Sequence, residues 1–157
     1  MCGGRIRTAR LKRIIWHEVS IMTDKALLGI DSNVLLRYIV CDDERQAEIA
    51  TQFMNSLSEN RKGFISIVVL IETIWVLSRA YGHKRQEICN FIDLLLSSSV
   101  LQVQFADVWE RVLHDEGFQD KDLGDAVIAV LGLQADCIET VTFDKKASKI
   151  EGMRLLK

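Results

Sequence analysis

The sequence of 157 residues contains no proline, where average usage would give about eight. No segment is therefore a proline-rich linker or stalk. Long hydrophobic runs are also missing, because Arg, Asp or Lys interrupts every apolar stretch before it reaches the roughly 18 residues of a membrane span. With 48% hydrophobic residues and the length of one typical domain, the chain is expected to fold as a single soluble, helix-rich unit.

Cysteine and histidine are too few and too scattered to build a zinc site. Cys2, Cys41, Cys89 and Cys137 form no CxxC pair, and the three histidines do not complete a ligand spacing. Free thiols in a reducing compartment are the simpler interpretation, which favours a cytoplasmic location. The sequence also has no GxSxG, P-loop or GxGxxG motif.

Charge is distributed unevenly along the chain. Residues 1–21 carry five basic residues and one acidic residue, which leaves 15 basic and 21 acidic residues in the remainder. We expect 1–21 to be a basic leader outside the fold, with Met22 as a possible natural start and 22–157 as the domain. The net negative charge of the domain would repel a nucleic acid. If the chain acts on nucleic acid, it must therefore bind phosphates locally, through a basic rim or a bound metal ion.

Hydrophobic periodicity predicts strands that alternate with helices. Short apolar runs predict strands, and amphipathic stretches of helical spacing predict helices between them. This order is typical of an α/β domain with a mainly parallel five-stranded sheet flanked by helices on both faces. The predicted strands are 26–30, 64–67, 100–104, 138–143 and 153–156, and the predicted helices are 34–40, 44–59, 68–81, 84–96, 106–116 and 122–135.

Acidic residues occupy the places where an α/β domain builds its site. Asp31 and Asp144 each end an apolar strand, and the functional crevice of an open sheet lies beyond those ends. Glu72 stands in an apolar helix, where a lone buried charge is costly. Asp122 and Asp125 share one face at the start of a helix.

Each acid also has a purely structural explanation. Asp31, or the Ser32 and Asn33 that follow it, would serve as a helix cap; Asp122 would do the same, and Asp144 would begin a turn. Taken together, however, four or five carboxylates at one sheet end repel one another, and a hard divalent cation offsets that repulsion. Mg2+ or Mn2+ prefers oxygen ligands and activates a bound water for attack on a phosphodiester.

Four strings of residues, in order, resemble the motifs of PIN-domain nucleases. The shared features are an apolar strand followed by Asp, Ser and Asn, a small polar residue before a helix with Glu, an acidic helix start, and a strand that ends in Asp. The strings are 28–35, 66–72, 122–129 and 141–144, within a resemblance that spans 26–144. The resemblance implies a five-stranded parallel sheet, dependence on Mg2+ or Mn2+, and cleavage of RNA.

The compact VapC branch of that family further implies a toxin that forms a homodimer and is inhibited by a cognate antitoxin. By this resemblance Asp31, Glu72 and Asp125 are metal ligands, Asp144 completes the site or holds its water, and Asp122 is an auxiliary acid. Polar residues beside them match positions that orient the carboxylates through hydrogen bonds, namely Ser32, Asn33 and Thr142.

Basic residues near the motifs are candidates for contacts with RNA, although exposed Lys and Arg are usually only solvated surface. They are Arg37, Arg79, Lys84, Arg85, Lys121, Lys145 and Lys146. Trp75 and Trp109 lie on apolar helix faces and are expected in the core. Two alternatives stay open: a catalytically idle PIN fold that acts as a binding module, and a phosphorylated receiver domain. The receiver pattern fits poorly, because Ser32 and Asn33 follow Asp31 where a second acid is needed.

Overall fold

The computed structural model describes residues 25–156, so the predicted leader at 1–21 and the proposed start at Met22 lie outside the described residues. Helices and parallel strands alternate along the chain, which confirms the α/β class. The first half contains β1 (Ala26–Gly29), α2 (Ser32–Val40), α3 (Glu44–Asn55), β2 (Arg61–Ile65), α4 (Ile67–Arg79), α5 (Arg85–Ser97) and β3 (Leu101–Val103). The second contains α6 (Ala106–His114), η1 (Glu116–Phe118), α7 (Leu123–Gln134), β4 (Thr140–Thr142), η2 (Ala147–Lys149) and β5 (Met153–Leu155).

Side-chain caps set where the helices that follow strands begin. Ser66 accepts a hydrogen bond from the backbone N of Val69, so α4 starts directly after β2. This cap also explains why β2 ends at Ile65 rather than at the predicted 67. The strand begins at Arg61, three residues earlier than predicted, because Arg61 and Lys62 pair with β1 although their charge hides the strand in the sequence.

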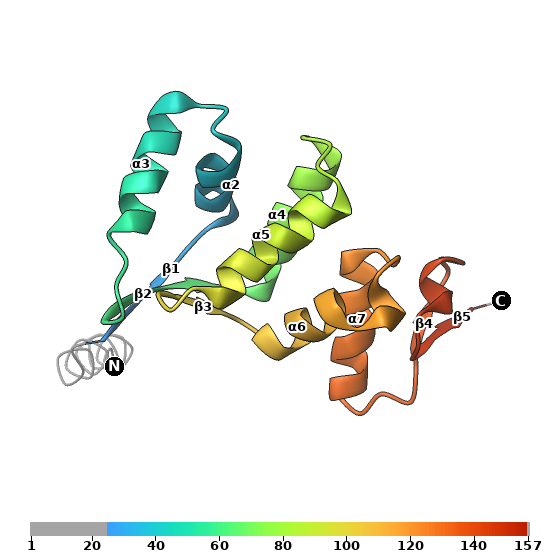
Figure 1. Cartoon of the computed structure of the whole chain (residues 1–157). Coiled ribbons are helices and arrows are strands. Elements are labelled where there is room, and N and C mark those ends of the chain that lie inside the picture. Colours follow the sequence, from blue (N-terminus) through green and yellow to red (C-terminus); the bar gives the residue numbers. More distant parts are fainter. Residues whose placement is uncertain (1–24, 157) are drawn as a thin grey trace, which may run out of the picture.

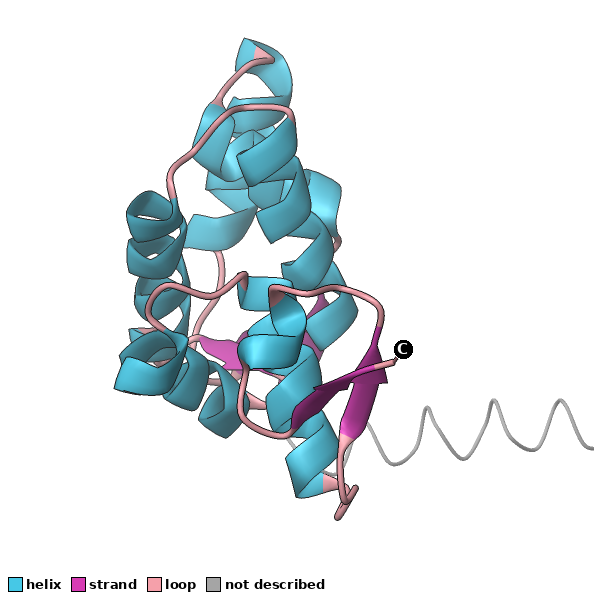
Figure 2. Ribbon diagram, turned by 90° about the vertical axis from the view of Figure 1, so that its right-hand side faces the viewer, coloured by secondary structure: helices cyan, strands magenta, loops and turns pink. Residues whose placement is uncertain are grey.

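The strands form two separate sheets rather than the single five-stranded sheet predicted. β1, β2 and β3 pair in that order, with Gly29 opposite Phe64 and Ile65 opposite Val103. β4 pairs only with β5, with Thr140 opposite Met153. All these pairs are parallel, as predicted. Figure 1 shows the two sheets at opposite ends of the view with α4 to α7 between them, and Figure 2 shows β4 and β5 side by side in front.

Helices were also predicted on both faces of the sheet, and this is not what the described residues show. Leu27 on β1 is 52% exposed and Val141 on β4 is 49% exposed. One face of each of these strands is therefore open within residues 25–156. None of the described helices is long and apolar enough to cross a membrane.

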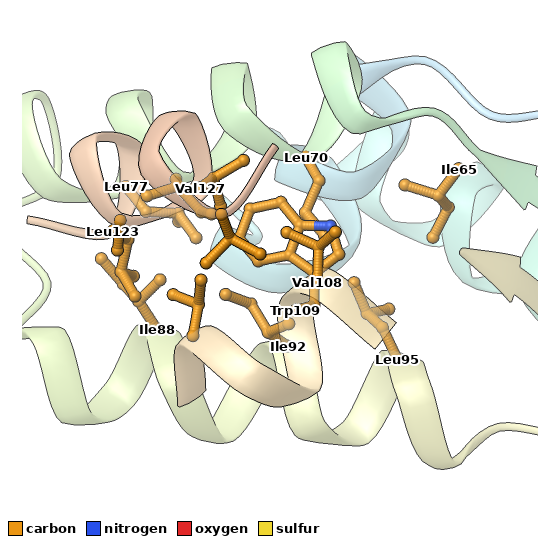
Figure 3. Close-up of a cluster of buried hydrophobic side chains, with 14 of the residues drawn as sticks. Ile65, Leu70, Leu77, Ile88, Ile92, Leu95, Val108, Trp109, Leu123 and Val127 are labelled. Carbon is orange, nitrogen blue, oxygen red and sulfur yellow. The ribbon is translucent and has the colours of Figure 1, made fainter. Parts of the chain in front are cut away.

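The core that separates the sheets is helical. Trp109 and Val108 of α6 are fully buried among side chains from three other helices (Figure 3). The partners drawn there are Leu70 and Leu77 of α4, Ile88, Ile92 and Leu95 of α5, and Leu123 and Val127 of α7. The prediction that Trp109 belongs to the core is confirmed. After β3 the chain continues through α6 and α7, which pack on the side of α4 and α5. As a result β4 lies beside α7 and does not pair with β1.

Gly132 allows α7 to approach β4 closely. A Cβ placed on Gly132 would collide with Oγ1 of Thr140 and lie 3.7 Å from its Cβ. The approach fixes β4, and with it the strand end that leads to Asp144, against the helix that carries Asp125.

The first prediction concerns this contact. In most helices Gly to Ala stabilises by about 1 kcal/mol, but we expect Gly132→Ala to lower the melting temperature because of the collision with Thr140. Thr140→Ala in the same chain should recover most of the loss. Thermal unfolding of the two single variants and the double variant measures this coupling, and a stabilised Gly132→Ala would contradict the close approach.

Candidate active site

A cleft of about 850 Å³ lies between α4, the start of α7 and the turn after β4. Its walls combine acids, cations and apolar side chains. Ile71, Ile74 and Trp75 of α4 form one side. The acids are Asp120, Asp122, Asp125 and Asp144, and the cations are Arg79, Arg85, Lys121, Lys146 and Lys149.

Asp122 begins α7 and presents Asp125 to the cleft. The Oδ1 atom of Asp122 accepts hydrogen bonds from the backbone N of Gly124 at 2.9 Å and of Asp125 at 3.2 Å. The capping role considered from the sequence is therefore present for this residue. Three residues later on the same helix face, Asp125 lies partly buried.

Asp125 is the acid whose environment disfavours its charge. Burial, followed by repulsion from Asp122 and Asp144, raises the pKa of its carboxyl above the usual value. Among the described residues no hydrogen-bond donor contacts that carboxylate. A cation placed beside Asp125 would remove the repulsion, so the donor chemistry here suits a hard divalent ion.

Asp144 is held by the turn that follows β4. Its Oδ1 accepts from the backbone N of Lys146 at 2.6 Å and of Ala147 at 3.2 Å, and these bonds lower the pKa of its carboxyl. The backbone N of Asp144 donates to Oγ1 of Thr142 at 3.0 Å. Thr142 therefore positions Asp144 through its backbone, while the carboxylate itself is oriented by the turn.

Asp31 and Glu72 lie outside this cleft. Asp31 caps α2 at the end of β1, where the Nδ2 of Asn33 donates to its Oδ2 at 3.0 Å. The sequence suggested that Glu72 is buried, but it is exposed, because α4 turns Leu70, Thr73 and Leu77 inward. Ser32 is buried beside Asp31. Among residues 25–156 no three His, Cys, Asp or Glu side chains come close enough together to hold a metal ion.

The predicted set of acids is therefore divided between two places. Asp122, Asp125 and Asp144 all line the cleft in the second half of the chain, while Asp31 and Glu72 belong to the first half. Oxygen donors of the right kind are present, but one copy of the chain does not gather the four core acids around one point.

The basic residues divide in a similar way. Arg79, Arg85, Lys121 and Lys146 line the cleft, whereas Lys84 and Lys145 do not. Arg37 also lies elsewhere, paired with Asp42 at 2.5 Å and hydrogen-bonded to Gln46. Arg85 donates to the carbonyls of Phe118 and Gln119 at 2.8 Å, and its buried Nη1 has no partner among the described residues.

Two cleft residues differ from the expectation drawn from the sequence. Lys149 was not singled out, although its place in η2, five residues after Asp144, was the available signal. Trp75 was expected in the core, but its side chain is 62% exposed and lines the cleft. Ile74 and Leu77 take the buried face of α4, so the turn of the helix directs Trp75 to solvent.

The amino-acid sequence matches the model of a known protein family. The PIN domain family model covers residues 29–153, and the chain belongs to this family. A VapC ribonuclease of Aquifex aeolicus (strain VF5) is 22% identical over 122 residues, which is 77% of this chain and 90% of that protein. The resemblance drawn from the four motifs is thereby confirmed, and the family and this relative together support a nuclease role.

The second prediction uses the opposite pKa shifts of Asp125 and Asp144. In EDTA at neutral pH, Asp125→Asn should melt at the same or a higher temperature, because a raised pKa means that the charged form opposes folding. The gain should vanish as the pH falls below the usual range of Asp. Asp144→Asn should lose stability at neutral pH and little in acid, because a lowered pKa stabilises only above that range.

Melting curves of the unmutated chain and both variants between about pH 3 and pH 8 check this contrast, since that interval spans the usual pKa of Asp. Asp136→Asn is the matched control, because Asp136 is exposed and has a positive φ of 57° that Asn tolerates equally well. A loss of stability at neutral pH in Asp125→Asn would show that this carboxylate has a structural role instead.

Proposed function

We propose that this chain is a Mg2+- or Mn2+-dependent endoribonuclease that hydrolyses RNA phosphodiesters, and that it is the toxin of a type II toxin-antitoxin pair. The observation that carries the proposal is the partly buried Asp125, whose carboxylate has no hydrogen-bond donor among residues 25–156 and which shares with Asp122 and Asp144 a cleft lined with cations. Membership of the PIN family and the VapC relative support the same reading.

The acids are proposed to bind the metal. Asp125 and Asp144 would hold the ion, with Asp122 as an auxiliary acid. Asp31 and Glu72 are proposed as further ligands from the family resemblance alone, because the structure places them outside the cleft. A bound divalent ion supplies a water of lowered pKa and neutralises charge on the scissile phosphate. Asp122 keeps its capping bonds to Gly124 and Asp125, so it fixes the start of α7 whether or not metal is present.

Cations on the cleft are proposed to hold the RNA. The chain as a whole is acidic, so phosphate must be attracted locally, and Arg79, Lys121, Lys146 and Lys149 surround the acids. The exposed ring of Trp75 offers a surface on which a base of a single-stranded segment can stack. This combination suits single-stranded RNA or a loop better than a continuous duplex.

The similarity to a VapC ribonuclease also suggests protein partners for this chain. The relative is named a VapC ribonuclease, and we propose by analogy that this chain forms a homodimer and has a cognate antitoxin. A short neighbouring gene for a DNA-binding protein would support the pairing. The competing reading is an idle PIN fold that binds RNA through the same cations without cutting it, and the assay below separates the two.

The third prediction is metal-dependent cleavage of RNA. The purified chain should cut single-stranded RNA in Mg2+ or Mn2+ and not in EDTA. Asp125→Asn and Glu72→Gln should each lose about 100-fold or more, because even outer-shell partners of metal ligands cost 10- to 100-fold. Asp136→Asn should cut normally. Binding of RNA without cleavage by the unmutated chain would favour the idle module.

The fourth prediction tests, without an activity assay, whether Asp125 binds metal or has only a structural role. Millimolar Mn2+ should raise the melting temperature of the unmutated chain, because a ligand that binds only the folded state stabilises it by mass action. Most of this rise should disappear in Asp125→Asn and persist in Asp136→Asn. A metal response left intact in Asp125→Asn would remove this residue from the ligand set.

Growth of a bacterial host tests the toxin reading. Induction of the chain should arrest growth, and Asp31→Asn or Glu72→Gln should relieve the arrest at equal levels of folded protein. Unimpaired growth with abundant folded chain would count against the toxin role. It would not affect the conclusion about RNA cleavage, which the nuclease assay tests separately.

A further inference from the structure

Arg85 of α5 holds the segment that leads into α7. Its Nε donates to the carbonyl of Gln119 and its Nη2 to the carbonyl of Phe118, both at 2.8 Å. This length is typical of charge-assisted hydrogen bonds, and the planar guanidinium presents its two donors in a fixed geometry. The start of α5 is thereby joined to the segment between α6 and α7.

The position of Arg85 within α5 is unfavourable for a cation on local grounds. It is the first residue of the helix, where the helix dipole favours negative charge. Its two acceptors stand at the end of η1, and carbonyls at the end of a helical turn lack partners within that turn. Arg85 therefore satisfies acceptors of the other segment, and those two bonds offset the cost at its own helix.

Little of this guanidinium is left for a phosphate. Nε and Nη2 of Arg85 are engaged by the two carbonyls, and Nη1 is buried without a partner among residues 25–156. An RNA phosphate in the cleft cannot reach the buried nitrogen unless the neighbouring segment moves. The sequence made Arg85 a candidate for contacts with RNA, but its hydrogen bonds point to a different task.

The segment that Arg85 holds is short and leads directly to the acids. Only two residues separate Gln119 from Asp122, which begins α7. The backbone N of Lys121 donates to the carbonyl of Phe118 at 3.0 Å, so the segment has little slack. Asp122 accepts in turn from the backbone N of Asp125 at 3.2 Å. A displaced carbonyl of Gln119 would therefore also displace Asp122 and the first turn of α7.

Apolar anchors flank the segment but do not hold its middle. Phe118 and Leu123 are buried in the shared core and fix where the segment begins and ends. Gln119, Asp120 and Asp122 lie between these anchors and are exposed. Loss of the two bonds from α5 would thus leave the core packed, while the exposed acids would be less well placed.

We propose that Arg85 is a positioning residue of the acidic site. Its two hydrogen bonds fix the segment 118–122, and with it the carboxylates of Asp122 and Asp125, so that both are in place before a divalent ion binds. A lysine at residue 85 would keep the charge but could not present two coplanar donors. The link to a metal ion rests on the proposed nuclease function, while the hold on the segment does not.

Amide hydrogen exchange of the full chain without metal tests the hold on the segment. In Arg85→Lys the amides of Lys121 and Asp125 should exchange on the order of tenfold faster, the effect of losing a hydrogen bond to a charged group. The amide of Val130, in the buried part of α7, should exchange as before. Arg37→Lys is the matched control, because Arg37 also donates two hydrogen bonds but lies outside the cleft.

Binding of Mn2+ tests the link to the site without an activity assay. Arg85→Lys and Arg85→Gln should each weaken Mn2+ binding about tenfold or more, as does removal of outer partners of metal ligands. Titration calorimetry gives the Kd on folded protein well below the melting temperature, so a general loss of stability does not enter. Arg37→Lys should bind Mn2+ like the unmutated chain.

The rival interpretation makes Arg85 a contact for an RNA phosphate. Affinity for a single-stranded oligonucleotide in EDTA, measured over a range of salt concentrations, separates the two. Each lost phosphate contact lowers the slope of log K against log salt by about 0.7 on single strands. We expect this fall for Lys149→Gln, whose cation lines the cleft, and not for Arg85→Gln.

The outcomes separate the two parts of the proposal. Unchanged exchange at Lys121 and Asp125 in a folded Arg85→Lys, or in Arg85→Gln should the first variant not fold, overturns the hold on the segment. Faster exchange with an unchanged Mn2+ affinity, or a lowered salt slope in Arg85→Gln, overturns the role at the site. If the unmutated chain binds no Mn2+ and cuts no RNA, the proposed function fails, and hydrogen exchange alone decides whether Arg85 holds the segment.

Discussion

Burial of the α6 face against α4, α5 and α7 is the constraint on which the rest of the structure depends. Trp109, Val108 and Val112 are fully buried there. Because this packing directs the chain after β3 along the helices, β4 arrives beside α7, and Gly132 lets the two lie in contact. Asp144 and Asp125 therefore line the same cleft, while Asp31 does not.

The same residues serve as caps and as a charge cluster. Asp122 begins α7 and Asp144 closes the turn after β4, so backbone N–H groups already stabilise their charge. Asp125 receives no such donor among the described residues, and burial, followed by repulsion from Asp122 and Asp144, raises the pKa of its carboxyl. A structural and a metal-binding interpretation of these acids are therefore compatible: two carboxylates are fixed by the backbone, and they crowd a third that gains from a cation.

Local patterns predicted the elements and the family, and they failed where long-range packing decides. The strand before Asp31, the helix after Ser66 and the acidic start of α7 were all readable, because caps and apolar runs are local signals. The division into two sheets could not be predicted, because the residues of β4 do not determine which strand it pairs with. The exposure of Glu72 and Trp75 was missed for a related reason: α4 is apolar around most of its surface, and only its contacts show which face turns outward.

The close contact between Gly132 and Thr140 links the spacing of two carboxylates to the packing of the core. Because α7 carries Asp125 and β4 leads to Asp144, a side chain at residue 132 that displaced β4 would also shift one carboxylate relative to the other. The cleft that both acids line is therefore sensitive to substitutions at a position that does not line it.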